Sequence, residues 1–395
     1  MRIGINASFL RKPATGIGQV TLNFLRKLIE LQVQNGKLRE HEIFLYMEED
    51  YVLHLPENFH KRIFLPLWRR DDILRKIFWE GRLLSHMAQK DKCDVFLSLY
   101  QSTSVFPKNV FHVMLVHDVI PHFFPEYLNN LRKRIYQKKI ERGVVVADRI
   151  LAVSKHTEKD LIRHFDISPE KISVNYIDVD PLFKKTVSHD VSARVLTKYH
   201  LSPGYIYAGG GLEKRKNIEG VLRAYAYLIS NFHFPISNQF PKQKIQIPKL
   251  VISGRLLPKL APLVTDVSKL VRKLNLTPHV KVLDFVEQED LPALYLGAQI
   301  FVYPSFYEGF GLPVLEAMNV GTPVVCARTT ALPEVAGDAA VFCNPQEIRS
   351  IAEKIKLLLV SKDKRELYSE RGKQRAKDFS WESFIQKFFA IVDNK

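Results

Sequence analysis

The sequence has little cysteine and no long hydrophobic run. Its three cysteines, Cys93, Cys326 and Cys343, are scattered and form no CxxC pair or Cys/His cluster. This pattern indicates neither a disulfide framework nor a zinc site, and it favours a reducing, cytosolic location. No apolar run reaches the length that spans a bilayer, and the N-terminal MRIGINASFL is too short and too interrupted for a signal peptide. We therefore expect a soluble, cytoplasmic protein.

Acidic residues are few relative to basic ones. The chain has 58 Lys and Arg against 42 Asp and Glu, which gives a formal net charge of +16. Such an excess points to a nucleic acid, an anionic membrane surface or an anionic substrate as a partner, unless lysine merely solvates the surface. No nucleic-acid-binding module is recognisable, so we expect no nucleic-acid partner.

The alternation of short apolar runs with helical patterns predicts an α/β fold. At 395 residues the chain is too long for one core and suits two domains of about 200 residues each. Helical patterns between successive runs imply parallel sheets that are covered on both faces. Buried strands are expected at 1–6, 43–47, 63–65, 95–99, 113–116, 150–153 and 172–176, and then at 205–208, 250–253, 280–283, 300–303, 323–326 and 340–342.

The polar stretch 178–203, with DVDPLFKK and LSPG, separates the two series of strands. We expect an N-terminal domain over 1–185 and a C-terminal domain over 190–378, with a cleft at the carboxyl ends of their strands. The final segment SWESFIQKFFAIVD has an apolar stripe at helical spacing, and we expect the helix within 379–395 to pack back onto the N-terminal domain. Residues 230–249, with three prolines and three lysines, are predicted to form a surface loop without chemistry.

One stretch, YEGFGLPVLEAMNVGTPVV at Tyr307–Val325, places two glutamates in a frame of glycine and proline. A strand is predicted just before it. Pro313 suits the first turn of a helix, and Gly321 suits its end. Glu308 then lies in the loop at the strand's carboxyl end, and Glu316 lies about one turn into the helix.

The start of this helix is a predicted anion site. The N–H groups around Phe310, Gly311 and Leu312 point out of the helix, and glycine lets a phosphate or sugar approach the backbone. A carboxylate beside them can accept hydrogen bonds from the vicinal hydroxyls of a ribose, so Glu316 can hold a ribose while Glu308 faces a sugar. Together these groups fit a nucleotide sugar. The alternative is that both acids only favour the helix dipole.

The motif resembles the E-x7-E signature of the retaining glycosyltransferases of family 4, which include bacterial mannosyltransferases. Further segments resemble that family in the same order along nearly the whole chain: ATGIGQVTLNFL, VHDVIP, ILAVSKHTEKDL and YAGGGLEKRKNIEGVLRAY. The resemblance implies the GT-B architecture, in which two Rossmann-like domains with parallel sheets face a central cleft. It also implies a hexosyltransferase that takes a sugar from a nucleoside diphosphate donor with retention and forms an α-linkage.

The resemblance assigns roles to further residues. Lys216 matches the family lysine that contacts the donor diphosphate, and Arg215 supplies a second cation to the leaving group. His117 is placed beside the reacting sugar, and Asp118 orients it or holds the acceptor. Some members have an arginine six positions before this lysine, where this chain has Gly210, so Arg215 or another cation could compensate.

His117 and Glu308 are thus the expected catalytic residues, and whether Glu308 is a nucleophile or a ligand of the donor sugar stays open. Gly16 and Gly18 follow the first strand, but Thr21 leaves the GxGxxG dinucleotide motif incomplete. We expect this loop either to close its backbone over the donor or to use glycine only for a tight turn.

Two segments of the N-terminal domain are strongly basic: NNLRKRIYQKKIERG at Asn129–Gly143 and WRRDDILRKIFWEGR at Trp68–Arg82. In the family this domain takes the acceptor, which is often lipid-linked. The segments are therefore candidates for peripheral contact with an anionic membrane on its cytoplasmic face. Ordinary solvated helix faces would explain the same residues.

The combined prediction is a transferase that uses a nucleoside diphosphate hexose, with GDP-mannose favoured because the opening segment resembles mannosyltransferases of the family. UDP-glucose or another hexose donor is the alternative, as is a catalytically silent protein that binds a sugar nucleotide or glycan. The acceptor is expected to be a hydroxyl of a glycan or lipid-linked intermediate in cell-surface polysaccharide synthesis. We expect no metal and no cofactor, because no DxD triplet lies near the predicted site.

Overall fold

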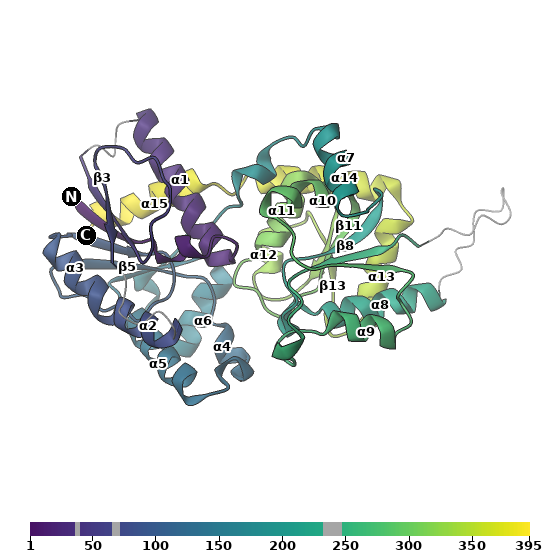
Figure 1. The fold of residues 1–395 in the computed structure, drawn as a ribbon, viewed down its shortest axis with the longest axis horizontal. Coiled ribbons are helices and arrows are strands. Elements are labelled where there is room, and N and C mark those ends of the chain that lie inside the picture. The colour runs from purple at the N-terminus through teal and green to yellow at the C-terminus, as the bar shows by residue number, and fades with distance from the viewer. Residues whose placement is uncertain (36–39, 65–71, 232–246) are drawn as a thin grey trace. The chain divides into compact units, whose positions relative to one another are not determined.

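The computed structural model describes residues 1–35, 40–64, 72–231 and 247–395 (Figure 1). The described chain divides into two compact units, Met1–Asp180 with Phe379–Lys395, and Pro181–Asp378. The first unit ends at Asp180 because the ring of Phe183, in the turn that follows, packs against Tyr295 of the second unit at 5.9 Å between centroids. The loop predicted at 230–249 lies mostly outside the described residues.

The described part of the first unit contains one sheet of seven parallel strands. The order β3-β2-β1-β4-β5-β6-β7 reverses its direction of growth between β1 and β4. Open α/β sheets bind ligands outside the carboxyl ends of their strands at such a switch point. The strands are β1 (Arg2–Asn6), β2 (Glu42–Met47), β3 (Phe59–Ile63), β4 (Val95–Ser98), β5 (Phe111–Val116), β6 (Arg149–Ala152) and β7 (Ile172–Val174).

Helices of the first unit connect these strands and cover the sheet (Figure 1). Several begin at a side-chain cap that satisfies a free backbone N–H, as Asn130 accepts from Lys133 and Ser154 from Thr157. The helices are α1 (Gly16–Asn35), α2 (Asp72–Phe78), α3 (Leu84–Lys90), α4 (Ile120–Phe123), α5 (Leu131–Val146), α6 (Lys155–Phe165) and α15 (Trp381–Asp393).

Helix α15 is contributed to the first unit by the far end of the sequence. It lies beside α1 (Figure 1), where the rings of Phe24 and Phe384 meet edge to face at 5.7 Å between centroids. The side chain of Asn175 donates to the carbonyl of Phe384 at 3.0 Å, and the indole of Trp381 donates to the carbonyl of Val179 at 3.1 Å. Its apolar stripe therefore completes the core of this unit.

The second unit has a sheet of six parallel strands in its described residues, in the order β10-β9-β8-β11-β12-β13. Its strands are β8 (Tyr205–Ala208), β9 (Leu250–Ser253), β10 (Val280–Leu283), β11 (Ala298–Tyr303), β12 (Val324–Ala327) and β13 (Val341–Cys343). Its helices are α7 (His189–Lys198), α8 (Ile218–Asn231), α9 (Val267–Lys273), α10 (Leu291–Gly297), α11 (Leu312–Val320), α12 (Leu332–Ala336), α13 (Ile348–Leu359) and α14 (Lys362–Ala376). The apolar faces of α8, α9 and α13 form one buried core cluster with strands of the sheet.

The strand predictions are confirmed except for the third. That strand was predicted at 63–65, but β3 spans Phe59–Ile63. It is an edge strand in which only Phe59 is buried, so its sequence contains no continuous apolar run. The apolar residues that follow it in the sequence therefore led to a strand being predicted too far toward the C-terminus. No described helix is long and apolar enough to cross a membrane.

Candidate active site

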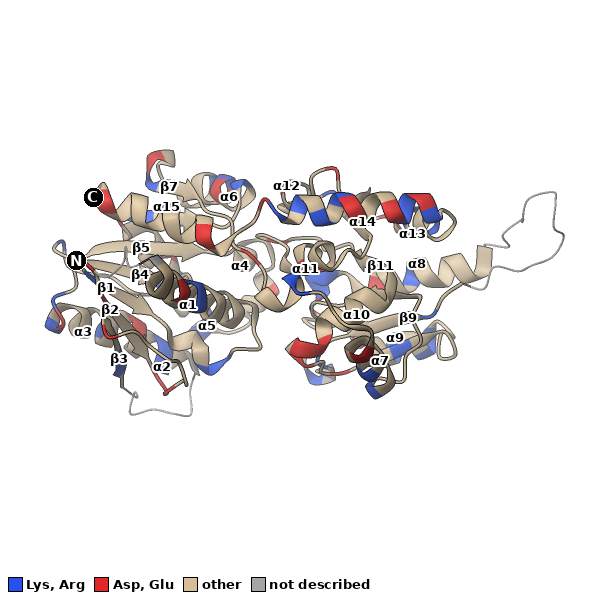
Figure 2. Cartoon of the chain, turned by 90° about the horizontal axis from the view of Figure 1, so that it is seen from above, with Lys and Arg blue, Asp and Glu red and all other residues tan. Residues whose placement is uncertain are grey.

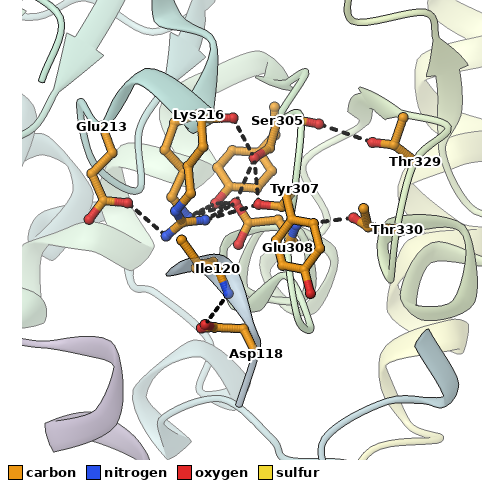
Figure 3. A network of polar contacts seen from close by, with 11 residues as sticks. Asp118, Ile120, Glu213, Lys216, Ser305, Tyr307, Glu308, Thr329 and Thr330 are labelled. Atoms are coloured by element: carbon orange, nitrogen blue, oxygen red, sulfur yellow. Dashed lines mark hydrogen bonds and ion pairs between the residues drawn. The ribbon is translucent and has the colours of Figure 1, made fainter. Parts of the chain in front are cut away.

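The carboxylate of Glu308 is the centre of a buried polar network in the second unit (Figure 3). It lies in the loop between β11 and α11, and its Oε1 accepts from the Lys216 ammonium at 2.7 Å and from Arg215 Nη1 at 2.9 Å. The same oxygen accepts from the Tyr303 hydroxyl at 2.8 Å and lies 2.7 Å from the Ser305 hydroxyl. In the described part of the chain all of these contacts fall on Oε1, which leaves Oε2 for a ligand.

The charges in this network are set by the pair of cations. Burial alone would raise the pKa of Glu308, but Lys216 and Arg215 outweigh it and lower that pKa to about 2. Burial lowers the pKa of Lys216, while Glu308 opposes that effect. Glu308 is therefore an anion at neutral pH, in a buried site where electrostatic interactions are strong.

Arg215 and Lys216 belong to one short 3-10 turn, Lys214–Lys216, between β8 and α8. Asn217 ends the turn in a left-handed conformation with φ of 58° and donates to the carbonyls of Pro304 and Pro345. These bonds tie the turn to the loops after β11 and β13, so the cations are brought to Glu308 by backbone geometry.

The guanidinium of Arg215 is held on several sides. Its Nη1 also donates to the Tyr307 carbonyl at 3.0 Å, and its Nη2 lies 2.7 Å from Glu213 Oε2. The backbone N–H of Glu308 in turn donates to Thr330 Oγ1 at 3.0 Å (Figure 3). Cations whose partners are carboxylates can exchange them for the oxygens of an entering anion.

The start of α11 has the predicted geometry. Gly311 precedes the helix with a φ of 113°, and a Cβ at this position would lie 2.6 Å from Leu332 Cδ2, so only glycine fits. Pro313 lies in the first turn and Gly321 ends the helix, which confirms both predictions. Phe310 is buried, and the N–H groups of Gly311 and Leu312 have no hydrogen-bond partner among the described residues.

Glu316 lies on α11, in its second turn, and is partly exposed. Its Oε2 accepts from the hydroxyl of Tyr295 on α10 at 2.8 Å. The two glutamates of the motif thus belong to one loop and helix, with the free N–H groups of the helix start between them in the sequence.

His117 and Asp118 follow the carboxyl end of β5 in the first unit. Nε2 of His117 lies 2.9 Å from the carbonyl of Leu99, and since a carbonyl only accepts, Nε2 carries the proton and Nδ1 is the acceptor. Burial lowers the pKa of His117 to about 4, so the ring is neutral at pH 7. It can therefore accept a hydrogen bond at Nδ1 but supplies no positive charge.

The amide of Gln101 fixes this segment. Its Oε1 accepts from the N–H of His117 at 3.2 Å, and its Nε2 donates to the carbonyl of Asp118 at 3.2 Å. The Asp118 carboxylate accepts from the N–H of Ile120 at 3.0 Å, at the start of α4 (Figure 3).

The structure separates the roles of the two N-terminal glycines. A Cβ on Gly18 would lie 2.0 Å from the carbonyl oxygen of Lys12, whereas a Cβ on Gly16 would meet nothing within 4 Å. Gly18 is therefore required for the close contact of α1 with the preceding loop, which is the tight-turn alternative. Gly16 is exposed, and packing does not explain its lack of a side chain.

A cavity of about 290 Å³ lies at the carboxyl ends of β1, β4 and β5, at the switch point of the first sheet. Aromatic rings of Phe9, Tyr100 and Tyr136 line it, together with the polar side chains of Lys76 and Asp118. The ammonium of Lys76 lies over the Phe9 ring at 4.6 Å. Rings with a few polar groups suit a ligand that has both an apolar face and hydroxyls.

A buried carboxylate supports the wall of this cavity. Glu80, in the π-helical turn Trp79–Leu83, accepts from the hydroxyls of Tyr100 at 2.9 Å and Tyr136 at 3.2 Å, and from the N–H of Thr103 at 3.0 Å. Burial raises the pKa of Glu80. The tyrosine rings are thereby fixed in place.

Tyr303, Ser305, Gln101 and Glu80 were not predicted as site residues from the sequence. Tyr303 and Ser305 flank the proline of VYPS, so polar groups at the end of an apolar strand were the available signal. Glu80 is an acid within the aromatic IFWEGR. None of the described His, Cys, Asp and Glu side chains forms a group of three or more that could hold a metal ion.

Comparison with known proteins places the chain in a family. The pattern of the family described as Glycosyltransferase Family 4 matches residues 14–181, and that of Glycosyl transferases group 1 matches residues 200–375. The O-antigen chain mannosyltransferase B of Escherichia coli is 31% identical over 408 residues, 97% of each chain. The serotype-specific mannosyltransferase WbdA of Escherichia coli is 29% identical over 275 residues, which are 68% of this chain but 32% of that protein.

The fold has counterparts among solved structures. HepE of Anabaena, solved in complex with UDP and glucose, superimposes over 100% of both chains with a TM-score of 0.71 at 17% identity. The chain therefore belongs to glycosyltransferase family 4 and has the GT-B architecture, with a parallel-sheet α/β fold in each unit. It is a hexosyltransferase.

Proposed function

We propose that this chain is a retaining mannosyltransferase that moves mannose from GDP-mannose to a hydroxyl of a glycan or lipid-linked acceptor, with an α-linkage, in cell-surface polysaccharide synthesis. The names of its relatives support mannose and the O-antigen setting. The observation that carries the proposal is the arrangement around the Glu308 carboxylate. Its Oε1 accepts hydrogen bonds from two cations, Lys216 and Arg215, and its Oε2 is available to a ligand. The carboxylate precedes a helix start whose N–H groups at Gly311 and Leu312 have no partner among the described residues.

Donor binding uses the charges of this network. When the donor binds, Lys216 and Arg215 form ion pairs with its diphosphate and no longer with Glu308. The N–H groups of Gly311 and Leu312 donate further hydrogen bonds to the diphosphate. Glu316 accepts hydrogen bonds from the ribose. The released Glu308 keeps its open oxygen toward a hydroxyl of the donor sugar.

Transfer then breaks the bond between the anomeric carbon and the phosphate oxygen, and the electron pair leaves with the nucleoside diphosphate. The acceptor oxygen bonds to the same face of the anomeric carbon, and its proton goes to the departing phosphate oxygen. Hydrogen bonds from several donors make Glu308 a weak nucleophile, so we favour this front-face route over a covalent intermediate. The anion of Glu308 and the acceptor nitrogen of His117 stabilise the sugar as positive charge develops.

Nucleotide selectivity tests the donor. A thermal-shift series with GDP, UDP, ADP and dTDP, without added metal, should give its largest increase in melting temperature with GDP, because a ligand of the folded state stabilises it. A larger increase with UDP would favour UDP-glucose or another UDP-hexose, as HepE binds UDP and glucose. Binding without release of nucleoside diphosphate in the presence of acceptors would favour a silent sugar-nucleotide-binding protein.

We propose that transfer needs no metal or other cofactor, because Lys216 and Arg215 can neutralise the leaving diphosphate. Turnover should then be unchanged in excess EDTA. A loss of turnover that Mg²⁺ or Mn²⁺ restores would contradict this part of the proposal.

The cavity of the first unit is the proposed acceptor site. Its aromatic rings can stack on the apolar face of a sugar, while Lys76 and Asp118 can bind hydroxyls. With an octyl mannoside as acceptor, Lys76→Ala should raise the KM for that acceptor and leave the GDP-induced thermal shift unchanged. An unchanged KM would exclude this cavity as the acceptor site.

We further propose peripheral contact of α5 with an anionic membrane surface. One exposed stripe of α5 alternates cations, including Lys138 and Lys139, with aliphatic side chains such as Leu131 and Ile135, which are 71% and 45% exposed. By contrast, α14 of the second unit intersperses Lys and Arg with Asp and Glu (Figure 2). Cations with adjacent apolar groups suit the headgroup region of an anionic bilayer.

Vesicle binding tests this contact. Cosedimentation with phosphatidylglycerol vesicles should exceed that with phosphatidylcholine vesicles and should fall as salt rises. Reversal of charge at Lys138 and Lys139 should weaken binding roughly 10-fold or more. Reversal at Lys362 and Lys364, exposed cations of α14, is the matched control and should change binding little. Equal losses in the two variants would show only a general charge effect.

A further inference from the structure

The hydroxyl of Tyr303 lies between the two oppositely charged groups of the site. Tyr303 ends β11 and is 1% exposed. Its hydroxyl donates to Glu308 Oε1 at 2.8 Å and accepts a short hydrogen bond from the ammonium of Lys216. The ring is stacked on Phe301 at 5.7 Å between centroids, so the hydroxyl has little freedom to move.

The donors to Glu308 differ in what an entering diphosphate can do to them. Lys216 and Arg215 are cations, so a diphosphate competes with the carboxylate for both. A hydroxyl of Tyr303 or Ser305 carries no charge and is not drawn away in the same manner. When the donor binds, the neutral hydroxyls are therefore the groups that remain to hold the carboxylate.

Of these hydroxyls, only that of Tyr303 has its proton committed to Glu308 among the described contacts. The Ser305 oxygen lies within hydrogen-bond distance of three acceptors, at 2.7 Å from Glu308 Oε1, 2.9 Å from the Arg215 carbonyl and 3.2 Å from the Tyr307 carbonyl. A hydroxyl has one proton to donate, so these acceptors share it. The Tyr303 oxygen receives from Lys216, and Glu308 takes its proton.

The backbone makes room for this tyrosine at the position where the family resemblance leads one to expect an arginine. Gly210 has a φ of 90°, and a Cβ there would lie 3.1 Å from Tyr303 Cε2 and 2.8 Å from Pro313 Cγ. A side chain at 210 would thus collide with the Tyr303 ring and the start of α11. The absence of an arginine at position 210 is therefore linked to the buried position of the Tyr303 ring, because the ring fills the space that such a side chain would need.

We infer that Tyr303 is a positioning residue, whose hydroxyl keeps the Glu308 carboxylate aimed at the donor sugar while Lys216 and Arg215 turn to the diphosphate. It acts through Glu308 and Lys216 and does not contact the sugar. This inference rests on the proposed sugar transfer. It extends that proposal by separating the groups that bind the diphosphate from the group that orients the carboxylate.

The test is Tyr303→Phe, which removes the hydroxyl and keeps the ring. The kcat for transfer should fall roughly 10- to 100-fold, as expected for a lost hydrogen bond to a charged group. The KM for the donor and the GDP-induced thermal shift should change less than about threefold, since the cations that hold the diphosphate remain. A general structural defect would not separate kcat from KM in this manner.

Tyr205→Phe is the matched control. Tyr205 is also a buried strand-end tyrosine of the second unit, 3% exposed, and its hydroxyl donates to the Leu294 carbonyl at 2.6 Å without touching Glu308. This variant should lose stability but retain kcat. An equal fall of kcat in both variants, or an unchanged kcat in Tyr303→Phe, would overturn the inference.

Ser305→Ala provides a second test that does not depend on the stability of Tyr303→Phe. Because the Ser305 proton is shared among three acceptors, Ser305→Ala should lower kcat by a smaller factor than the roughly 10- to 100-fold expected for Tyr303→Phe. A loss as large as that of Glu308→Gln would contradict the role of Tyr303. If the unmodified protein releases no nucleoside diphosphate from any sugar donor, the proposed function is wrong. If the unmodified protein transfers the sugar but the variants do not behave as predicted, only the inference about Tyr303 is wrong.

Discussion

Glu308→Gln is the change that most directly tests the electrostatics of the site. It keeps the shape of the side chain but removes the charge that Lys216 and Arg215 face. The side chains of Glu308 and Lys216 are 8% and 7% exposed, so their interaction is little screened by solvent. Removing one partner of a buried ion pair leaves the other as an uncompensated charge.

The expected magnitude follows from the pKa of Glu308. Because the folded structure lowers this pKa from 4.5 to about 2, and one pKa unit corresponds to about 1.4 kcal/mol, the ionised form contributes about 3 kcal/mol to stability at pH 7. The measured cost of breaking buried pairs, about 3–5 kcal/mol, is of the same size. The melting temperature should fall by roughly 6–12 °C.

The assay is urea unfolding at pH 7 and at pH 3.5, with Glu316→Gln as the control. The stabilising effect of a carboxylate with a lowered pKa is complete above the unfolded value of 4.5 and is lost as the pH falls toward about 2. The difference between the unmodified protein and Glu308→Gln should therefore shrink by about 1 kcal/mol at pH 3.5. Glu316 is partly exposed and accepts a hydrogen bond from a neutral hydroxyl. Glu316→Gln should therefore lower the free energy of unfolding by less than Glu308→Gln does.

The same substitution should affect nucleotide binding in the opposite direction from its effect on stability. In Glu308→Gln the diphosphate no longer competes with a carboxylate for the two cations, so GDP should bind at least as tightly as before while turnover falls. A variant of unchanged stability, or one whose stability deficit is the same at both pH values, would refute the electrostatic reasoning. Weaker binding of GDP would show that the cations do not exchange partners.

Three further predictions, two of them with a matched control variant, test other parts of the site. Lys216→Ala should weaken GDP binding roughly 10- to 100-fold as measured by titration calorimetry, while Lys214→Ala, an exposed cation of the same turn, should not. Gly18→Ala should lower the free energy of unfolding, measured with urea, by roughly 1–3 kcal/mol because its Cβ would collide with the Lys12 carbonyl. Gly16→Ala should leave the free energy of unfolding unchanged, and it should lower the rate of transfer only if this loop closes over the donor. Because the folded pKa of His117 is about 4 and its ordinary value is 6.5, the unfolded chain binds an extra proton between these values, and His117→Gln should make stability less sensitive to acid in that window.

Much of the fold could be predicted from periodicity. The buried parallel strands are continuous apolar runs, as β8 with YIYA and β12 with VVCA show, because both faces of such a sheet are covered. The edge strand β3 was misplaced because its sequence, FHKRI, faces solvent on part of its length. A strand at an edge need not carry an apolar signal.

The local sequence of the motif places both of its glutamates at the start of one helix. Glu308 and Glu316 are bound to one loop and helix by the glycines and Pro313 between them, and these residues dictate the backbone there whatever surrounds it. The partners of Glu308 could not be predicted in this way, because Arg215 and Lys216 precede it by more than ninety residues. They reach it only through the pairing of the neighbouring strands β8 and β11. The commitment of the Tyr303 proton likewise depends on distances between separate segments, which no sequence pattern encodes.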